Sequence, residues 1–124
     1  MRPLPSDELL DRIADVLKAM ADATRLRILH TLQDGELCVS DILARVGGSQ
    51  ANVSKHLSVL RRTGLVECRR DGLRVLYRIA DESVFEICRT VCDSLVERLG
   101  REHEAVLQAR REMAPAGDGA GGTR

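Results

Sequence analysis

The chain has 124 residues, 44% of them hydrophobic, and this length fits one domain with a single apolar core. Its 19 Lys and Arg residues balance its 19 Asp and Glu residues, so the net charge predicts no general affinity for polyanions. Aromatic residues make up 2%, which argues against a protein that binds single strands by base stacking. We find neither a signal-peptide pattern nor a run of about 18 apolar residues, so we expect a cytoplasmic protein with no membrane partner.

Two helices are predicted at the start of the chain. Ser6, followed by Asp7 and Glu8, is typical of a helix N-terminus. Apolar residues then recur at helical spacing at Leu9, Leu10, Ile13, Val16, Leu17 and Met20. A second helix is predicted over residues 23–32, closed by Gln33-Asp34-Gly35, with His30 packed in the interior. Its other inward residues are Leu26, Ile28, Leu29 and Leu32.

A helix-turn-helix is predicted next. Residues 39–46 read as a short helix, and Gly47-Gly48 turns the chain into a second helix that reaches Arg62. The inward residues of this second helix are expected to be Ala51, Val53, Leu57 and Leu60. Its polar face carries amides, hydroxyls and cations, namely Gln50, Asn52, Ser54, Lys55, Ser58, Arg61 and Arg62. Such groups bond base edges and phosphate oxygens, so this face suits a DNA major groove.

A β-hairpin follows the second of these helices. Strands are predicted over residues 65–69 and 74–79, around Arg70-Asp71-Gly72-Leu73, where Asp-Gly is a strong hairpin signal. Between residues 50 and 78 the acidic residues are only Glu67 and Asp71. The basic residues there are Lys55, Arg61, Arg62, Arg69, Arg70, Arg74 and Arg78. We expect the hairpin to be a wing whose arginines contact the DNA backbone or the minor groove.

A long helix is predicted from a cap at Asp81 to about Glu112. Its apolar side carries Val84, Ile87, Cys88, Val91, Cys92, Leu95, Leu99 and Val106. This face is longer than a small domain needs and, together with the first helix, it predicts a homodimer interface. We expect residues 1–113 to form one domain that includes both dimerising helices. Pro, Gly and Ala dominate from Ala114, so residues 114–124 are expected to be a disordered tail.

These elements predict a mainly α protein with a β-hairpin wing, α+β in class, organised as a dimeric winged helix-turn-helix. Duplex operator DNA is the expected partner. The residues expected to contact it are Ser49, Gln50, Asn52, Ser54, Lys55, His56, Ser58, Arg62, Arg70 and Arg74. For His56 a second interpretation stays open, because it shares a helical face with Val53 and Leu60 and could simply pack at the edge of the core.

Several segments together resemble the ArsR/SmtB family of winged-helix repressors. They are Ala21-Asp22-Ala23-Thr24-Arg25-Leu26-Arg27-Ile28-Leu29, Glu36-Leu37-Cys38-Val39-Ser40-Asp41-Ile42, and residues 49–60 and 72–77. The resemblance implies a homodimer that leaves its operator when an effector binds, commonly a metal ion, a metalloid or a thiol-oxidising species. It also implies that Arg25 and Arg27 lie near phosphates or in internal links of the fold, rather than being merely solvated charges.

The sequence departs from the metal-sensing members of that family in two places. Of the three cysteines that arsenic-sensing members carry on the third helix, only Cys38 is present, with Ser40 and Leu43 at the other two positions. The positions of the zinc ligands on the last helix hold Asp81, Ser83, Ser94 and Glu97. Because no imidazole is among them, tight zinc binding there is not expected.

Four cysteines in a reducing compartment are expected to be thiols, and three are candidates for receiving a signal. Cys88 and Cys92 are one helical turn apart, with Cβ atoms about 5 to 6 Å from each other. A disulfide needs about 3.8 Å, so a soft metal or arsenite-like metalloid ion, or a bridge of extra sulfur atoms, fits better. Cys38 is a less certain third ligand. In the other interpretation, all three are ordinary packed residues, as is Cys68 on its strand.

Three function classes follow from these observations. The favoured one is a transcriptional repressor whose cysteine thiols bind a soft metal or metalloid ion or become modified, with no obligatory cofactor. A thiol-based sensor of reactive sulfur or redox state, or a DNA-binding regulator of the same fold without an effector, are the alternatives. An enzyme is not expected, because no catalytic motif or phosphate-binding glycine loop is present.

Overall fold

The structure, a computed structural model, describes residues 1–113. Residues 1–85 form one compact unit, and the described residues from 86 to 113 belong to a second. The tail expected at residues 114–124 lies outside the described residues. In the described part, no helix combines the length and the apolar character that crossing a membrane requires.

Helices α1 (Asp7–Met20) and α2 (Ala23–Thr31) begin where the sequence predicted. The Ser6 side chain accepts a hydrogen bond from the Leu9 amide at 3.2 Å, and Asp22 caps α2 by accepting from the Arg25 amide at 3.0 Å. A short 3₁₀ turn, η1 (Leu32–Asp34), follows α2. The interior position predicted for His30 is wrong: its side chain is exposed and its ring centroid lies 5.3 Å from that of Phe85.

The helix-turn-helix consists of α3 (Val39–Val46) and α4 (Gln50–Arg62). Gly47 and Gly48 between them have φ angles of 83° and 88°, a left-handed conformation that residues with a Cβ rarely adopt. Ser49 then caps α4 by accepting from the Asn52 amide at 3.1 Å. The prediction that Ala51 faces inward is wrong, because it is exposed. Ala51 lies two residues from buried Val53, and residues at that spacing point in different directions on a helix.

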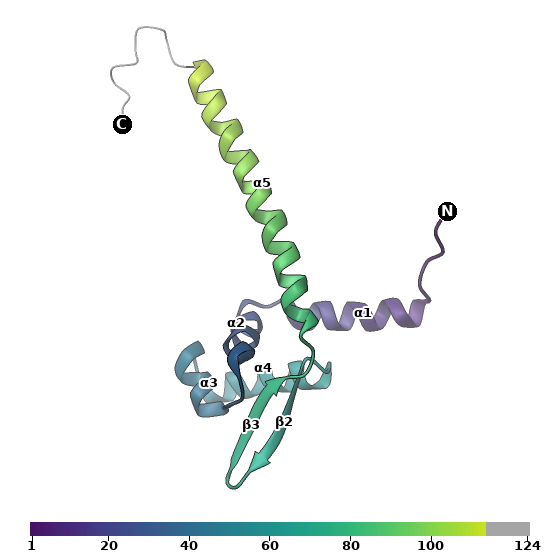
Figure 1. Ribbon diagram of the computed structural model, residues 1–124, viewed down its shortest axis with the longest axis vertical. Helices are drawn as coiled ribbons and strands as arrows, with labels where there is room; N and C mark the ends of the chain where they lie inside the picture. Colours follow the sequence, from purple (N-terminus) through teal and green to yellow (C-terminus); the bar gives the residue numbers. More distant parts are fainter. Residues whose placement is uncertain (114–124) are drawn as a thin grey trace. The chain divides into compact units, whose positions relative to one another are not determined.

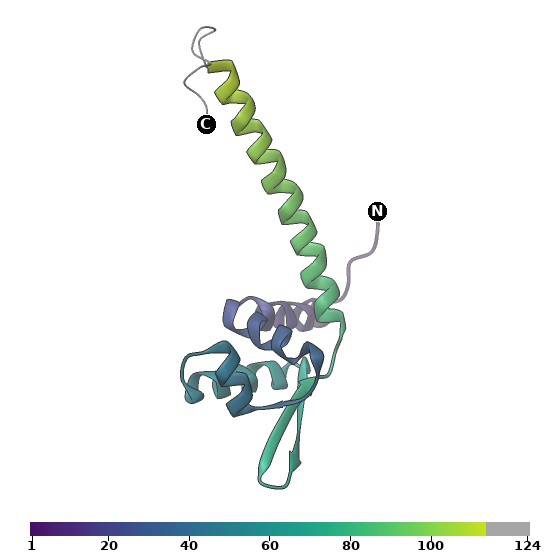
Figure 2. The same cartoon turned by 60° about the vertical axis from the view of Figure 1, so that its left-hand side comes forward.

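The sheet has three antiparallel strands in the order β1-β3-β2, with β1 (Leu37–Cys38), β2 (Val66–Asp71) and β3 (Arg74–Ile79). Strand β1 was not predicted, because two residues are too few to show alternation. Strand β2 runs two residues further than predicted: Arg70 pairs with Val75 and Asp71 with Arg74, so the turn consists of Gly72 and Leu73 and not of all four residues 70–73. Figure 1 shows the tip of this β2–β3 hairpin projecting away from the helices of the same unit, and Figure 2 shows the same from another side.

The core of the first unit lies where α2, α3, α4 and the base of the hairpin meet. The side chains that are at most 2% exposed there are Ile28, Leu29, Leu32, Ile42, Val53, Leu57, Leu60, Leu65, Val66 and Val84. Val84 belongs to the first turn of α5 (Ser83–Met113), so the long helix begins inside this core. The Asp81 carboxylate accepts from the Ser83 amide at 3.0 Å, which supports the predicted cap.

Two helices, α1 and α5, leave several large apolar side chains exposed. In α1 the exposed fractions are 49% for Leu9, 42% for Leu10, 42% for Ile13 and 47% for Leu17. In α5 they are 52% for Val91, 43% for Leu95, 65% for Val96, 60% for Leu99 and 65% for Val106. A run of exposed apolar residues along a helix is typical of a surface that another chain covers.

Replacing Leu57 by alanine tests the role of the buried face of α4. Leu57 is 0% exposed, so Leu57→Ala is expected to lower the free energy of unfolding by about 2 to 5 kcal/mol through lost burial and a cavity. Leu73→Ala is the matched control, because Leu73 is 100% exposed at the hairpin turn. Urea denaturation followed by circular dichroism measures both. Equal midpoints for the two variants would contradict this packing.

Candidate nucleic-acid interface

Helix α4 presents the polar face that the sequence predicted. The side chains of Gln50, Asn52, Ser54, Lys55, Ser58 and Arg62 are exposed. Burial of Val53, Leu57 and Leu60, each 0% exposed, fixes the rotation of the helix that turns this polar face outward. Ser49 is also exposed, but its hydroxyl already accepts from the Asn52 amide at 3.1 Å, so it remains available chiefly as a donor.

The positive charge of the α4 and wing region is smaller than the sequence suggests, because two of its arginines are paired. Arg69 binds Glu36 through two hydrogen bonds of 2.8 Å, and this contact is the main cause that lowers the pKa of the Glu36 carboxyl. Arg78 pairs with Glu67 on the neighbouring strand at 2.6 Å. Within residues 1–113 no ion pair holds the remaining basic residues, which are Lys55, Arg61, Arg62, Arg70 and Arg74.

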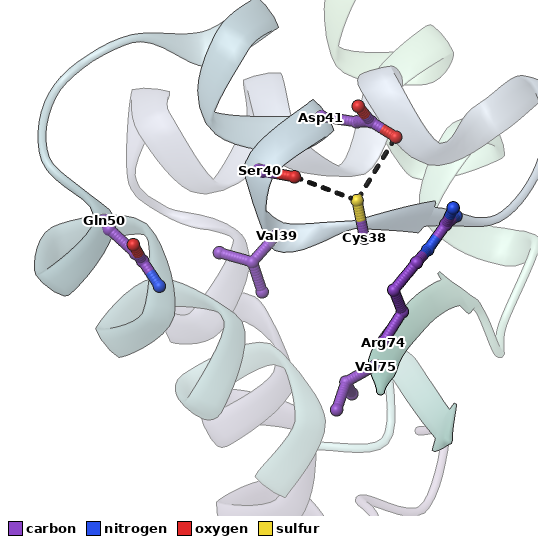
Figure 3. Close-up of a pocket in the computed structure, with 7 residues that line it drawn as sticks. All are labelled: Cys38, Val39, Ser40, Asp41, Gln50, Arg74 and Val75. Carbon is purple, nitrogen blue, oxygen red and sulfur yellow. Dashed lines mark hydrogen bonds between the residues drawn. The ribbon is translucent and has the colours of Figure 1, made fainter. Parts of the chain in front are cut away.

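The start of α4 and the wing border the same hollow. A cavity of about 450 Å³ is lined by Gln50 of α4, by Arg74 and Val75 of β3, and by residues 38–41 between them. Figure 3 shows Gln50 on one side of this hollow and Arg74 on the other. A side chain expected to read bases and one expected to bind the backbone therefore belong to one continuous surface.

Arg61 is a candidate that the predicted set of contacts left out. It lines a second hollow, of about 420 Å³, together with Cys68, Arg69, Arg70, Val75 and Tyr77 of the wing. Arg61 and Arg62 are adjacent in the last turn of α4, and their spacing alone does not tell which of them meets the sheet. Both are exposed cations, and such side chains are the usual partners of DNA phosphates.

His56 is half-buried, and its ring is tied to α2. Its Nδ1 atom lies 3.3 Å from Nη1 of Arg25. The same guanidinium donates from Nε to the Ala19 carbonyl at 2.5 Å and from Nη2 to the Lys18 carbonyl at 3.1 Å. Arg25 is thus an internal link, one of the alternatives that the resemblance implied, whereas Arg27 is exposed on the same helix.

The four cysteines lie in different surroundings. In α5, Cys88 is half-buried and Cys92 is exposed, so Cys92 does not belong to the core of this chain. Burial raises the pKa of the Cys88 thiol. Cys38 ends β1 and directly precedes α3, and its Sγ lies 3.1 Å from Ser40 Oγ and 3.2 Å from Asp41 Oδ2 (Figure 3). Cys68 is half-buried on β2, opposite Tyr77.

A complete metal site is not assembled by these thiols in the described part of one chain. Across residues 1–113, no three His, Cys, Asp or Glu side chains are grouped so that they could hold a metal ion. The pair Cys88 and Cys92 supplies two sulfur ligands from adjacent turns of one helix. Further ligands would have to come from a bound reagent, from water or from a second chain.

The chain is similar to known regulators of transcription. A family model described as the bacterial regulatory protein arsR family matches residues 22–67. The chain is 39% identical over 85 residues to the HTH-type transcriptional regulator KmtR of Mycobacterium tuberculosis, an alignment that covers 68% of this chain and 65% of KmtR. It is 41% identical over 86 residues to the transcriptional repressor SmtB homolog of Synechocystis, covering 69% and 65%.

A solved structure extends this similarity to the fold. The solution structure of Mb0332 from Mycobacterium bovis, a homodimeric winged helix-turn-helix DNA-binding domain, matches with a TM-score of 0.67 and 39% identity, over 78% of this chain and 95% of that domain. The chain spans 65% of the length of each of the two curated relatives. The matched proteins are regulators of transcription, which confirms both the predicted winged-helix fold and the prediction that the chain is not an enzyme.

Proposed function

The chain belongs to the ArsR family of bacterial regulatory proteins, and from this premise we propose that it is a cytoplasmic, homodimeric repressor that leaves its operator when its cysteines receive a signal. The observation that supports DNA binding most directly is the hollow shared by Gln50 and Arg74, which joins α4 and the wing into one surface. We propose that residues 1–113 act together as the repressor domain.

Each group of residues on this surface has its own proposed role. Gln50 and Asn52 would read base edges in the major groove, because their amides can donate and accept at adjacent atoms. Ser49, Ser54 and Ser58 would donate to phosphate oxygens. The cations of this surface that form no ion pair within residues 1–113 would bind the backbone and displace counterions; they are Lys55, Arg62, Arg70 and Arg74, with Arg61 added.

The homodimer is proposed from the exposed apolar residues of α1 and α5. Leu95, Leu99 and Val106 lie on the side of α5 that the sequence predicted to be covered, and they are 43%, 60% and 65% exposed in the single chain. A two-fold dimer would cover such a surface with its own copy. It would also present two copies of α4 to the half-sites of a pseudo-palindrome.

The signal is proposed to act at Cys88 and Cys92, with Cys38 as a third and less certain ligand. The two thiols of α5 lie on adjacent helical turns, where a thiophilic ion or a chain of sulfur atoms fits better than a simple disulfide. Exposure of Cys92 leaves the pair accessible in this chain. We favour a soft metal or arsenite-like ion as the effector. The test below also distinguishes two alternatives: that the signal is reactive sulfur, and that the protein has no effector.

Replacing a wing arginine and replacing an amide side chain of α4 should have different effects on DNA binding. Arg74→Ala is expected to weaken binding to all sequences and to reduce the salt slope by about 0.9, the amount for one lost phosphate contact. Arg78→Ala is the matched control, because Arg78 is on the same strand but paired with Glu67. Gln50→Ala should instead relax base preference. These effects are measured by fluorescence anisotropy on operator and random duplexes at several salt concentrations; an unchanged slope for Arg74→Ala would contradict the wing assignment.

The dimer is tested by sedimentation velocity at micromolar concentration. The wild-type chain is expected to sediment as a dimer, and Leu95→Asp to shift it toward monomer by burying a charge in the interface. Leu73→Asp places the same charge at the exposed hairpin turn and should leave the dimer intact. A wild-type monomer that operator DNA does not convert to a dimer would rule the proposal out.

The sensing role is tested by replacing the α5 thiols. Cys88→Ser, Cys92→Ser and the double variant should bind operator normally but fail to release it when treated with arsenite or with an organic persulfide, whereas Cys68→Ser should respond like wild type. Mass spectrometry separates the chemistries, since added sulfur atoms indicate persulfidation and stoichiometric arsenic indicates coordination. If the double variant still released operator DNA normally, the sensing role would be wrong and both cysteines would be ordinary packed residues.

A further inference from the structure

We propose that Arg25 is a positioning residue for DNA binding: it holds His56 in the tautomer whose proton is on Nε2 and thereby prepares that N–H to donate to a DNA phosphate. The inference rests on the proposed function, because it assigns a partner to one residue of the proposed interface. Its basis is the contact of 3.3 Å between Arg25 Nη1 and His56 Nδ1.

The direction of this hydrogen bond follows from the chemistry of the two side chains. A guanidinium carries only N–H donors and stays charged, so it cannot accept a proton from the imidazole. His56 Nδ1 must therefore be the acceptor, and an acceptor ring nitrogen carries no proton. The ring is then neutral with its one N–H at Nε2, and among the described residues no hydrogen bond is formed by that atom.

Besides the imidazole, two backbone carbonyls hold the Arg25 guanidinium in place. Its Nε and Nη2 atoms donate to the Ala19 and Lys18 carbonyls near the end of α1, where carbonyl groups lack N–H donors further along the helix. The Lys18 carbonyl also accepts from the Ala21 amide at 3.1 Å. The Arg25 amide donates to the Asp22 carboxylate at 3.0 Å, and this contact is the main cause that lowers the pKa of Asp22. An arginine held in this way has little freedom to release the imidazole.

His56 lies at the edge of the exposed polar face of α4. Its neighbours Val53, Leu57 and Leu60 are fully buried, while Lys55 and Ser54 beside it are exposed. A half-buried residue between these two faces is better placed for the DNA backbone than for base edges at the floor of the groove. The charged groups that face the imidazole are Arg25 and Asp22. A neutral Nε2–H is the remaining donor for a phosphate oxygen.

The tautomer can be measured on the free wild-type protein. The chain has 3 histidines, so ¹⁵N-histidine labelling gives a simple long-range ¹H–¹⁵N spectrum in which variants at His30 and His103 identify the His56 signals. At pH 8, His56 is expected to show only the Nε2–H pattern, because its Nδ1 accepts from Arg25. A predominant Nδ1–H pattern would overturn the proposal, whatever the DNA experiments give.

Variants at Arg25 connect the tautomer to DNA binding. Arg25→Met removes every donor and should give a mixture of His56 tautomers and roughly three- to tenfold weaker operator binding, the loss of one hydrogen bond. Arg25→Lys keeps a donor and should restore part of both. Arg27→Met is the control for the tautomer on the same helix: it should leave the His56 tautomer unchanged, because among the described residues the side chain bonded to the His56 ring is that of Arg25. Urea denaturation reports whether each variant is folded.

A double-mutant cycle separates positioning from general destabilisation. In the His56→Leu background, Arg25→Met should weaken operator binding much less than it does alone, because the hydrogen bond it prepares is already gone. Equal losses in both backgrounds, or unchanged His56 ¹⁵N shifts in Arg25→Met, would overturn the proposal. If wild-type chain binds no duplex at all, the proposed function fails while the tautomer measurement still stands.

Discussion

The buried stripe of α4 is the constraint on which the interface depends. Val53, Leu57 and Leu60 have no solvent exposure, and together they fix the rotation of the helix about its axis. Once that rotation is fixed, the residues between them are turned outward, and amides, hydroxyls and cations occupy one face. The Gly47-Gly48 turn sets where the helix starts, because its left-handed backbone ends α3 within two residues. Hydrophobic burial therefore determines which polar groups are offered to a partner.

The positive charge available on the candidate interface depends on which arginines form ion pairs, and not only on how many there are. Glu36 precedes β1 and Arg69 lies on β2, so their two hydrogen bonds connect the outer strands across β3. The Glu67–Arg78 pair connects β2 with β3. The Glu36–Arg69 pair therefore holds the wing to the body of the fold, and the Glu67–Arg78 pair holds the two wing strands together. Between residues 50 and 78, the cations without an ion pair in the described chain lie on α4 and near the hairpin tip, where a backbone that leaves the major groove would pass.

Periodicity predicted the elements that bury a regular stripe, and it failed where contact is non-local. The start of α1, all of α3 and the extent of α4 follow from capping residues and apolar spacing alone. The two-residue strand β1 depends on its partner β3, far away in the chain, and has no local signal. For the same reason, the sequence could name Arg25, His56, Arg69 and Glu36 but could not pair them. The contact of His30 with Phe85 is likewise non-local, and spacing on α2 does not reveal it.

Helix α5 gives a physical route by which a signal at the thiols could reach the DNA-binding unit. Val84 in its first turn is 1% exposed in the same core as α4, Cys88 follows one turn later, and Cys92 follows one turn after that. A ligand that pulls the two sulfur atoms together would strain a helix whose first turn is packed in that core. It can shift binding only by its preference for one conformation, with a coupling of about 1 to 3 kcal/mol in typical cases. A continuous helix anchored at Val84 requires no further contact to carry such a strain, which is why the α5 pair is a stronger candidate than Cys38, whose thiol is already engaged by Ser40 and Asp41.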